Sequence, residues 1–323
     1  MDNEKDTIWE DNEDIAAAAM ERRRLASLRP NLLLRAKAIA QTRDFFAKKD
    51  FLEIQTPVRI PTPALEDYID AIPSGDAWLR TSPEFHLKRM LAAGYDKIFQ
   101  IGPCFRKDEC GKRHLLEFTM LEWYRAGGNW MDVLKDTEEL LKSVALATLN
   151  STKCHFRGHV LDLGTTWDTI TVEKAFADFA GEDLDKCIEE GRFEQVLVSK
   201  VEPCLGINGR PTALTEYPLA CSGLSRQIPG RPNRVERWEF YIAGLELGNA
   251  CSELAEPAEQ TRRFKECAFL RHRENRIVYK LDQPFLDAIR LGMPPAAGVA
   301  IGMDRLFMML LDLDTIADAS AFA

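Results

Sequence analysis

The spacing of apolar residues predicts long helices and short strands that alternate along the chain. Apolar residues in 32–46 recur at helical spacing, and Asn31 is the expected N-cap of this helix. Residues 51–56 alternate as a strand that stops at Pro57, because proline has no N–H to donate to a neighbouring strand. A second helical stripe covers 131–149. The chain is long enough to form one large domain or two ordinary ones.

Two stretches with strand-like alternation are predicted to form hairpins. Residues 105–124 begin with Phe-Arg-Lys-Asp-Glu, pass a short basic loop and end in Glu-Phe-Thr-Met-Leu-Glu-Trp-Tyr. Residues 234–254 contain a turn at Ala243-Gly244 between two apolar strands. In the first hairpin, a guanidinium and further cations meet rings and carboxylates. That combination suits an anionic ligand with a planar base beside a cationic group, as when a nucleotide meets a basic amino acid.

Two more segments place polar groups at the start of helices. The turn at Ser82-Pro83 leaves Glu84 in a first helical turn, where it either complements the helix dipole or anchors a substrate ammonium. Near the C-terminus, a small-residue strand that contains Gly298 runs directly into an apolar helix with Arg305 in its first turn. Because glycine lets a ligand approach the backbone, Arg305 is a candidate phosphate ligand.

Composition narrows the class of protein. The 323 residues are 46% hydrophobic and 29% charged, which is the balance of a globular protein. No apolar run has the length of a membrane span, and the acidic N-terminus is unlike a signal peptide, so we expect a cytoplasmic protein without a membrane partner. The net charge of -9 argues against nucleic acid as the main partner, because such binding needs clustered cations.

Three ordered motifs make the chain resemble the catalytic domain of class II aminoacyl-tRNA synthetases, in the lysyl subgroup. Residues 51–57 are similar to motif 1, 105–124 to motif 2 and 298–310 to motif 3. The resemblance implies an α+β fold, with a six-to-seven-stranded antiparallel sheet flanked by helices, and a homodimer formed through motif 1. It assigns 31–323 to the catalytic domain and leaves 1–30 as an N-terminal tail and helix, partly flexible.

Residues 1–28 show no strand pattern, whereas a nucleic-acid-binding barrel needs about 25 to 30 residues in strands alone. The chain therefore resembles the elongation factor P lysine ligase family, also called PoxA or GenX, more than a complete tRNA synthetase. The resemblance implies that ATP and Mg²⁺ activate lysine or β-lysine as an adenylate. The acceptor would be a lysine side chain of elongation factor P, not tRNA. Ala300 favours this assignment, because the tRNA synthetases carry glycine there and the ligases alanine.

Two alternatives remain open at this point. The chain could be a truncated lysyl-tRNA synthetase that charges tRNA, or a non-catalytic paralogue that senses an amino acid or a nucleotide. Departures from the family pattern motivate the second alternative. Leu115 stands where the family has an asparagine that could bond ATP, and Ala250-Cys251 replaces Gly-Phe, which removes a ring from the wall of the substrate site.

The resemblance also implies residue roles. The expected ATP-binding residues are Arg106, Lys107, Asp108, His114, Phe118, Glu246, Leu247, Gly302 and Arg305. Arg106 on the α-phosphate and Arg305 on the γ-phosphate are the expected catalytic residues, and Glu246 is the expected Mg²⁺ ligand. The expected amino-acid-binding residues are Ser82, Pro83, Glu84, Glu122, Tyr124, Asn249 and Glu253. Glu84 and Glu253 would pair with two ammonium groups, so we expect a diamine acid: α-lysine, β-lysine or another diamine.

Overall fold

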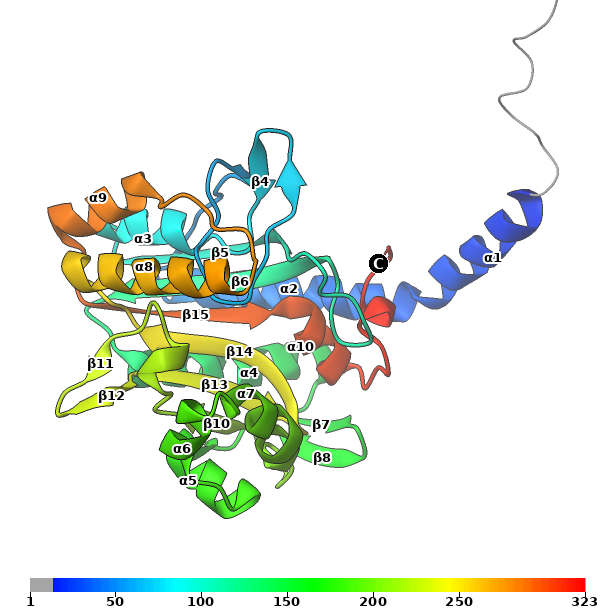
Figure 1. The fold of residues 1–323 in the computed structure, drawn as a ribbon. Coiled ribbons are helices and arrows are strands. Elements are labelled where there is room, and N and C mark those ends of the chain that lie inside the picture. Colours follow the sequence, from blue (N-terminus) through cyan, green and yellow to red (C-terminus); the bar gives the residue numbers. More distant parts are fainter. Residues whose placement is uncertain (1–13, 323) are drawn as a thin grey trace, which may run out of the picture.

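A single eight-stranded sheet organises the computed structural model, which describes residues 14–322 (Figure 1). In spatial order its strands are β1 (Leu52–Glu53), β5 (Lys97–Phe105), β6 (Glu117–Ala126), β15 (Ala296–Gly302), β14 (Leu245–Ser252), β13 (Arg237–Ile242), β10 (Thr212–Thr215) and β9 (Asp168–Thr171). The inner pairs are antiparallel, and the edge pairs β1–β5 and β9–β10 are parallel. The predicted α+β class is confirmed. The sheet has eight strands rather than six or seven, because short parallel strands extend both edges.

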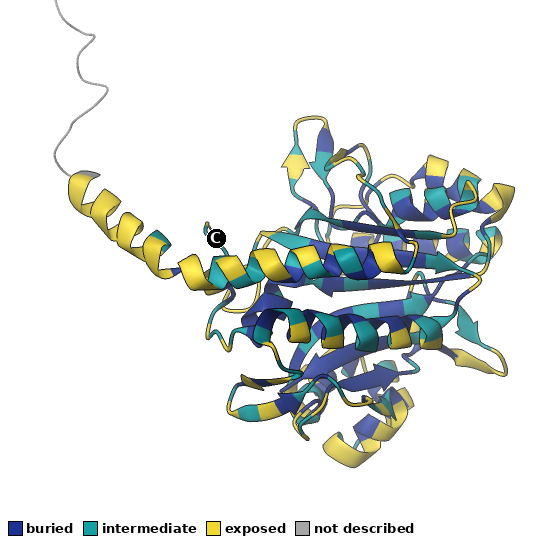
Figure 2. Ribbon diagram, turned by 180° about the vertical axis from the view of Figure 1, so that it is seen from behind, coloured by how far each residue is buried: buried dark blue, intermediate teal, exposed yellow. Residues whose placement is uncertain are grey.

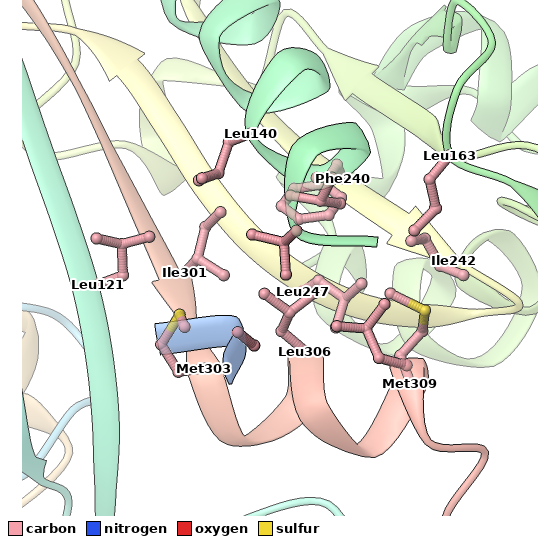
Figure 3. Packing of buried hydrophobic residues seen from close by; sticks show 14 of the residues in the cluster. Leu121, Leu140, Leu163, Phe240, Ile242, Leu247, Ile301, Met303, Leu306 and Met309 are labelled. Atoms are coloured by element: carbon pink, nitrogen blue, oxygen red, sulfur yellow. The ribbon is translucent and has the colours of Figure 1, made fainter. Parts of the chain in front are cut away.

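Long helices cover one face of this sheet. α2 (Arg29–Lys48) and α4 (Trp130–Leu149) lie side by side behind the strands, and α10 (Met303–Leu310) follows β15 directly (Figures 1 and 2). Their apolar faces and those of the strands form the main core, in which Leu140, Phe240, Ile301 and Leu306 point toward one another (Figure 3). Phe46 of α2 stacks on Phe99 of β5 with ring centroids 4.6 Å apart. This core fixes which side chains remain on the opposite face.

A smaller helical layer stands over the opposite face at one end of the sheet. It consists of α3 (Glu84–Ala92), α8 (Pro257–Arg273) and α9 (Gln283–Gly292), seen in front of the strands in Figure 1. Phe85 of α3 stacks on Phe285 of α9 with centroids 4.1 Å apart, and Phe264 of α8 closes the cluster. The space between this layer and the sheet contains the candidate site.

The remaining elements lie at the periphery. They are α1 (Asp14–Ser27), the small sheet of β2 (Arg59–Ile60), β3 (Pro73–Ser74) and β4 (Ala77–Leu79), the hairpins β7 (Lys153–Phe156) with β8 (His159–Asp162) and β11 (Gln227–Ile228) with β12 (Arg231–Val235), the helices α5 (Val172–Ala175), α6 (Leu184–Glu189) and α7 (Phe193–Val196), and short helical turns at Phe176–Ala180, Leu197–Val201, Glu202–Cys204, Leu219–Cys221 and Ile316–Ala319. α1 projects from the body and is exposed along most of its length (Figure 2). Across 14–322, no helix has both the length and the apolarity of a membrane span.

Two predicted boundaries were wrong. The helix expected to start after Asn31 begins at Arg29, because Pro30 fits the first helical turn instead of breaking the chain. The Asn31 side chain therefore does not cap α2; it donates to the Asp318 carbonyl at 3.2 Å. The strand expected over 51–56 is reduced to β1, although the Ile54 N–H still donates to the Phe99 carbonyl at 2.8 Å.

Candidate active site

The register of the central strands places the predicted amino-acid residues on the face away from the core. Leu121 and Trp123 of β6 are fully buried in the main core, so Glu122 and Tyr124, which alternate with them, lie on the other face. Across the sheet, Glu122 is in register with Ala300, which is in register with Asn249. Three segments far apart in the sequence thus form one continuous row.

A bulge in β14 keeps two expected ligands on the same face. Phe240 pairs with Gly248 and Tyr241 pairs with Glu246, so Leu247 is the extra residue on β14. Its side chain is 1% exposed and points into the core (Figure 3). Only the backbone of Leu247 can therefore meet the nucleotide beside which it was expected. Because of the bulge, Glu246 and Asn249, three positions apart, share the open face.

Arg305 joins the segments expected to bind the nucleotide. Its Nη1 donates to the Glu246 carbonyl at 2.9 Å and forms an ion pair with the Glu246 carboxylate at 3.2 Å. Its Nε donates to the Arg113 carbonyl at 3.2 Å, and its Nη2 contacts Nε2 of His114. Burial, and then the nearby Arg305, lower the pKa of His114, which favours the neutral imidazole at neutral pH. The motif 2 loop, β14 and α10 therefore meet at one guanidinium.

Arg106 lies just beyond the end of β5, one residue past the predicted strand position. Its guanidinium lies over the Phe118 ring, 5.2 Å from the centroid, and its Nη1 is 3.6 Å from a carboxylate oxygen of Glu109. Its Nε is buried and has no hydrogen-bond partner within the described residues. Part of the guanidinium fork is thus free for an anion. The next two residues, Lys107 and Asp108, are exposed, and the Lys107 Nζ lies 4.0 Å from a carboxylate oxygen of Asp108.

A buried ion pair supports this end of the site, and sequence reasoning missed it. Asp304, immediately before Arg305, accepts a hydrogen bond from the Thr119 N–H at 2.6 Å and pairs with Arg35 of α2. Arg35 also donates to the Thr119 hydroxyl at 2.9 Å. These contacts hold α10 against β6, and so fix Arg305 relative to Arg106. A carboxylate beside Arg305, at the start of a helix that is otherwise apolar, was the available signal.

The turn before α3 binds the second strand of motif 2. Ser82 donates to the Glu122 carboxylate at 2.6 Å, and the Tyr124 hydroxyl donates to its other oxygen at 3.1 Å. The Glu84 N–H donates to the Ser82 hydroxyl at 2.9 Å, with Pro83 at the N-cap of α3. Burial and, secondly, Glu84 raise the pKa of Glu122 to about 8, so this carboxyl is largely protonated at neutral pH. The structure thus brings these five expected residues together.

Lys88 occupies the position between the two carboxylates that were expected to hold ammonium groups. It lies one turn after Glu84 on α3, its side chain is 1% exposed, and its Nζ is 2.5 Å from a Glu84 oxygen. The same Nζ forms an ion pair with Glu253, which is 2% exposed. Burial lowers the pKa of Lys88, but Glu253 and Glu84 outweigh it and raise the pKa above its usual value. Both carboxylates therefore already have a counter-cation, and the i, i+4 spacing could have revealed the pair of Lys88 with Glu84.

Two glycines of β15 have different surroundings. A Cβ at Gly298 would lie 2.2 Å from Cε1 of Tyr124 and 2.8 Å from a carboxylate oxygen of Glu253, so both groups rest directly on the glycine. A Cβ at Gly302 would find its nearest neighbour, the Arg305 side chain, at 3.9 Å. A Cβ at Gly302 would thus make only ordinary van der Waals contact, so the backbone there is less tightly covered than at Gly298.

A second polar cluster, also missed from the sequence, orients Asn249. Nε of Arg237 donates to the Asn249 side-chain oxygen at 3.1 Å, and the same guanidinium pairs with Glu239. Glu239 also accepts hydrogen bonds from the hydroxyls of Tyr217 and Tyr241 at 2.6 and 2.7 Å. The direction of the Asn249 amide is thus set by a chain of buried contacts.

A cavity of about 1010 Å³ lies beside these groups, and its lining includes Glu66, Glu84, Arg237, Asn249 and Cys251. Its volume is at the upper end of the range for small-molecule sites. The Cys251 thiol, where the family pattern has a ring, lies 3.7 Å from a Glu253 oxygen. Leu115, the other departure, packs against the main core. Glu66 was not predicted, because it lies outside every motif.

The donor set at Glu246 is compatible with a metal that is held mainly by phosphates. Among residues 14–322, no three His, Cys, Asp or Glu side chains cluster as a metal site. Glu246 is 37% exposed at its side chain. Mg²⁺ is commonly held by one or two carboxylates together with substrate phosphates and water. Glu246 therefore fits the role of a single protein ligand.

Motifs 2 and 3 meet on the open face of one largely antiparallel sheet, and motif 1 supplies its edge strand β1; together they define the class of protein. The chain belongs to the class II tRNA synthetase family (D, K and N), whose model matches residues 13–323. It is 38% identical, over 309 residues, to an elongation factor P–(R)-β-lysine ligase of Haemophilus influenzae (strain PittGG), with 91% of this chain and 94% of the relative covered. The predicted family is confirmed.

The chain is also similar to lysine–tRNA ligases. It is 34% identical over 321 residues to that of Carboxydothermus hydrogenoformans, with 91% of this chain and 65% of the relative covered. It is 31% identical over 313 residues to that of Prochlorococcus marinus (strain MIT 9515), with 89% and 61% covered. The chain thus spans less than two thirds of the length of these tRNA ligases.

Proposed function

We propose that this protein activates lysine or β-lysine with ATP and transfers it to a lysine side chain of elongation factor P. The observation that carries the proposal is the placement of two kinds of group on one sheet face. Arg106, Arg305 and Glu246 stand at one end, and Glu84 and Glu122 stand at the other. A substrate that spans both ends would present its carboxylate to a bound triphosphate.

In the first step, the substrate carboxylate attacks the α-phosphorus of ATP and pyrophosphate leaves. Positioning supplies most of the rate, because the site holds both reactants on rigid strands. Arg106 would neutralise charge on the α-phosphate during the attack, and Arg305 would hold the leaving phosphates. When bound, Mg²⁺ would neutralise phosphate charge further, with Glu246 as its protein ligand. No side-chain acid or base is needed here, since the carboxylate is already ionised.

Two observations support elongation factor P as the acceptor. The ligase relative is matched over 94% of its length at 38% identity, against 31–34% for the two tRNA ligases above. Ala300, in register between Glu122 and Asn249, is the residue that the ligase resemblance implies. The tRNA ligase relatives favour a second candidate, the charging of tRNA with lysine. We also propose that the protein is cytoplasmic. We further propose that it forms a homodimer, which light scattering of the purified protein would test.

The experiment measures ATP–pyrophosphate exchange with α-lysine, (R)-β-lysine and ornithine in separate reactions. We expect exchange with at least one of the two lysines, followed by a mass gain of elongation factor P on incubation. Exchange with charging of tRNA but no mass gain of the factor would support the second candidate. If no amino acid supports exchange while ATP still binds, and Arg106→Ala abolishes that binding, the protein senses ligands and the proposal is wrong.

A further inference from the structure

The loop 66–70 is held rigidly against the candidate site. Arg271 of α8 is fully buried, and its Nη1 donates to the backbone carbonyls of Glu66 and Ile69 at 2.6 and 3.0 Å. The same guanidinium pairs with Asp70. From the other side, the Lys107 N–H of the motif 2 loop donates to the Asp70 carbonyl at 2.8 Å. Glu66 is therefore presented from a fixed backbone, beside the segment that carries Arg106.

Among the described residues the Glu66 carboxylate has no partner, in contrast to the three carboxylates at the amino-acid end of the site. Glu84 and Glu253 share Lys88, and Glu122 is bound by Ser82 and Tyr124. The Glu66 side chain forms no ion pair or hydrogen bond with any residue of 14–322, and it lines the 1010 Å³ cavity. A carboxylate held on a rigid loop and open to a substrate cavity is available to react.

The surroundings of Glu66 place it where the two halves of the site meet. Burial raises the pKa of Glu66 to about 7, Arg106 and Arg237 lower it, and Glu84 and Asp67 raise it. These four charged groups come from the motif 2 loop, β13, α3 and the loop itself. A group with this pKa exists in both protonation states near neutral pH, which is the condition for efficient general base catalysis.

The second step of the proposed reaction requires such a group. A lysine side chain has an ordinary pKa of about 10.4, so about one acceptor in a thousand carries a free amine at neutral pH. The adenylate carbonyl reacts only with that free amine. An ammonium entering the cavity must therefore lose a proton close to the reacting carbonyl.

We propose that Glu66 is the general base of the transfer step, an inference that rests on the function proposed above. The Glu66 carboxylate takes one proton from the acceptor ammonium. The amine nitrogen then forms a bond to the carbonyl carbon, and the bond from that carbon to the phosphate oxygen breaks, with its electron pair leaving on AMP. The second proton leaves the nitrogen as the intermediate collapses and goes to the departing phosphate. Glu66 returns its proton to water.

The test compares Glu66→Gln with the wild type in single-turnover transfer from preformed adenylate to two nucleophiles. Transfer to a lysine side chain, on elongation factor P or on Nα-acetyl-lysine, should fall about 10²- to 10³-fold in the variant. Transfer to hydroxylamine, which is already unprotonated at pH 8, should remain within about twofold. The wild-type rate with lysine should rise up to about pH 7 and then level off. The variant rate should continue to rise toward pH 9.

Glu194→Gln is the matched control, because Glu194 lines the same cavity but is influenced by Glu239 rather than Arg106. It should transfer to both nucleophiles at the wild-type rate. Equal loss with lysine and hydroxylamine in Glu66→Gln, or a raised KM for the amino acid in pyrophosphate exchange, would overturn the proposal and make Glu66 a substrate ligand. Wild-type transfer to lysine by the variant would also overturn it. Failure of the wild type to form any adenylate would instead overturn the proposed function.

Discussion

Replacing Lys88 with methionine tests the electrostatic organisation of the amino-acid end. Methionine fills nearly the same buried volume, so the main change is the loss of one positive charge between Glu84 and Glu253. In the wild type these three side chains are 1%, 16% and 2% exposed, respectively. We expect Lys88→Met to lower the free energy of unfolding and to weaken amino-acid-dependent pyrophosphate exchange.

The magnitude follows from the burial of the pair. Two unit charges 4 Å apart at an effective dielectric constant of 20 attract by about 4 kcal/mol, and Lys88 has two such partners. Much of this attraction offsets the cost of taking the charges out of water. Removing one partner of a buried pair typically costs about 3–5 kcal/mol, because the remaining charge is left without compensation. We expect a loss in that range at pH 8.

The loss should depend on pH. Burial already raises the pKa of Glu253, and Lys88 opposes that rise, so removing Lys88 should raise the folded-state pKa further. A carboxyl whose folded-state pKa lies above its unfolded value loses stability as pH rises through that interval. The difference between variant and wild type should therefore be small near pH 5, where the carboxyls can take up protons, and largest at pH 8.

Urea unfolding followed by tryptophan fluorescence at pH 5 and pH 8 measures this difference. The control is Lys48→Met on α2, which removes an exposed i, i+4 partner of Asp44 and should change stability by about 0.5 kcal/mol or less. A Lys88→Met loss below about 1 kcal/mol at pH 8 would refute the reasoning, since it would mean that the buried pair contributes no more than a surface pair. An equal loss at both pH values would refute the protonation argument.

Two further predictions concern residues on the same face. Gly298→Ala should lower kcat/KM for the amino acid by about 5- to 150-fold in pyrophosphate exchange, because overpacking against Tyr124 costs about 1–3 kcal/mol. Gly302→Ala should mainly raise KM for ATP. If both variants changed the same kinetic constant, the placement of the amino-acid and nucleotide ends would be contradicted. Glu122→Gln should show a smaller fall in stability between pH 5 and pH 8 than the wild type, because the pKa of Glu122, about 8 in the fold, makes the wild type lose stability as that carboxyl ionises. Parallel stability curves in urea titrations would exclude this assignment.

The sequence allowed prediction of the elements that depend on local pattern. The hairpin turn at Ala243-Gly244 and the small-residue strand that runs into α10 are present as expected, because alternation and glycine placement are local signals. The start of α2 was misplaced, because a proline and an asparagine each have two local uses. The expected residues of β6 and β14 share one face of the sheet, since strand periodicity decides which side chains lie together.

Long-range pairing could not be predicted in the same way. Lys88 was a visible cation, but its contact with Glu253 joins residues 165 positions apart, and nothing local specifies it. Likewise, Arg271 holds the loop that presents Glu66 from a helix at the far end of the chain. Such contacts depend on how helices pack over the sheet. In a site formed by several segments, the sequence motifs therefore predict the residues that bind ligands. They do not predict the ion-pair partners and supporting contacts of those residues.

The extra residue in β14 makes the site sensitive to chain length in a way that substitutions do not reveal. Glu246 and Asn249 face the ligands only because Leu247 adds one position between them. Deleting one residue there would turn one of the two half-sites inward and expose part of the core. The segment 246–249 can therefore change its side chains during evolution or engineering but not its number of residues. A surface loop outside the sheet can vary in length without moving Glu246 or Asn249.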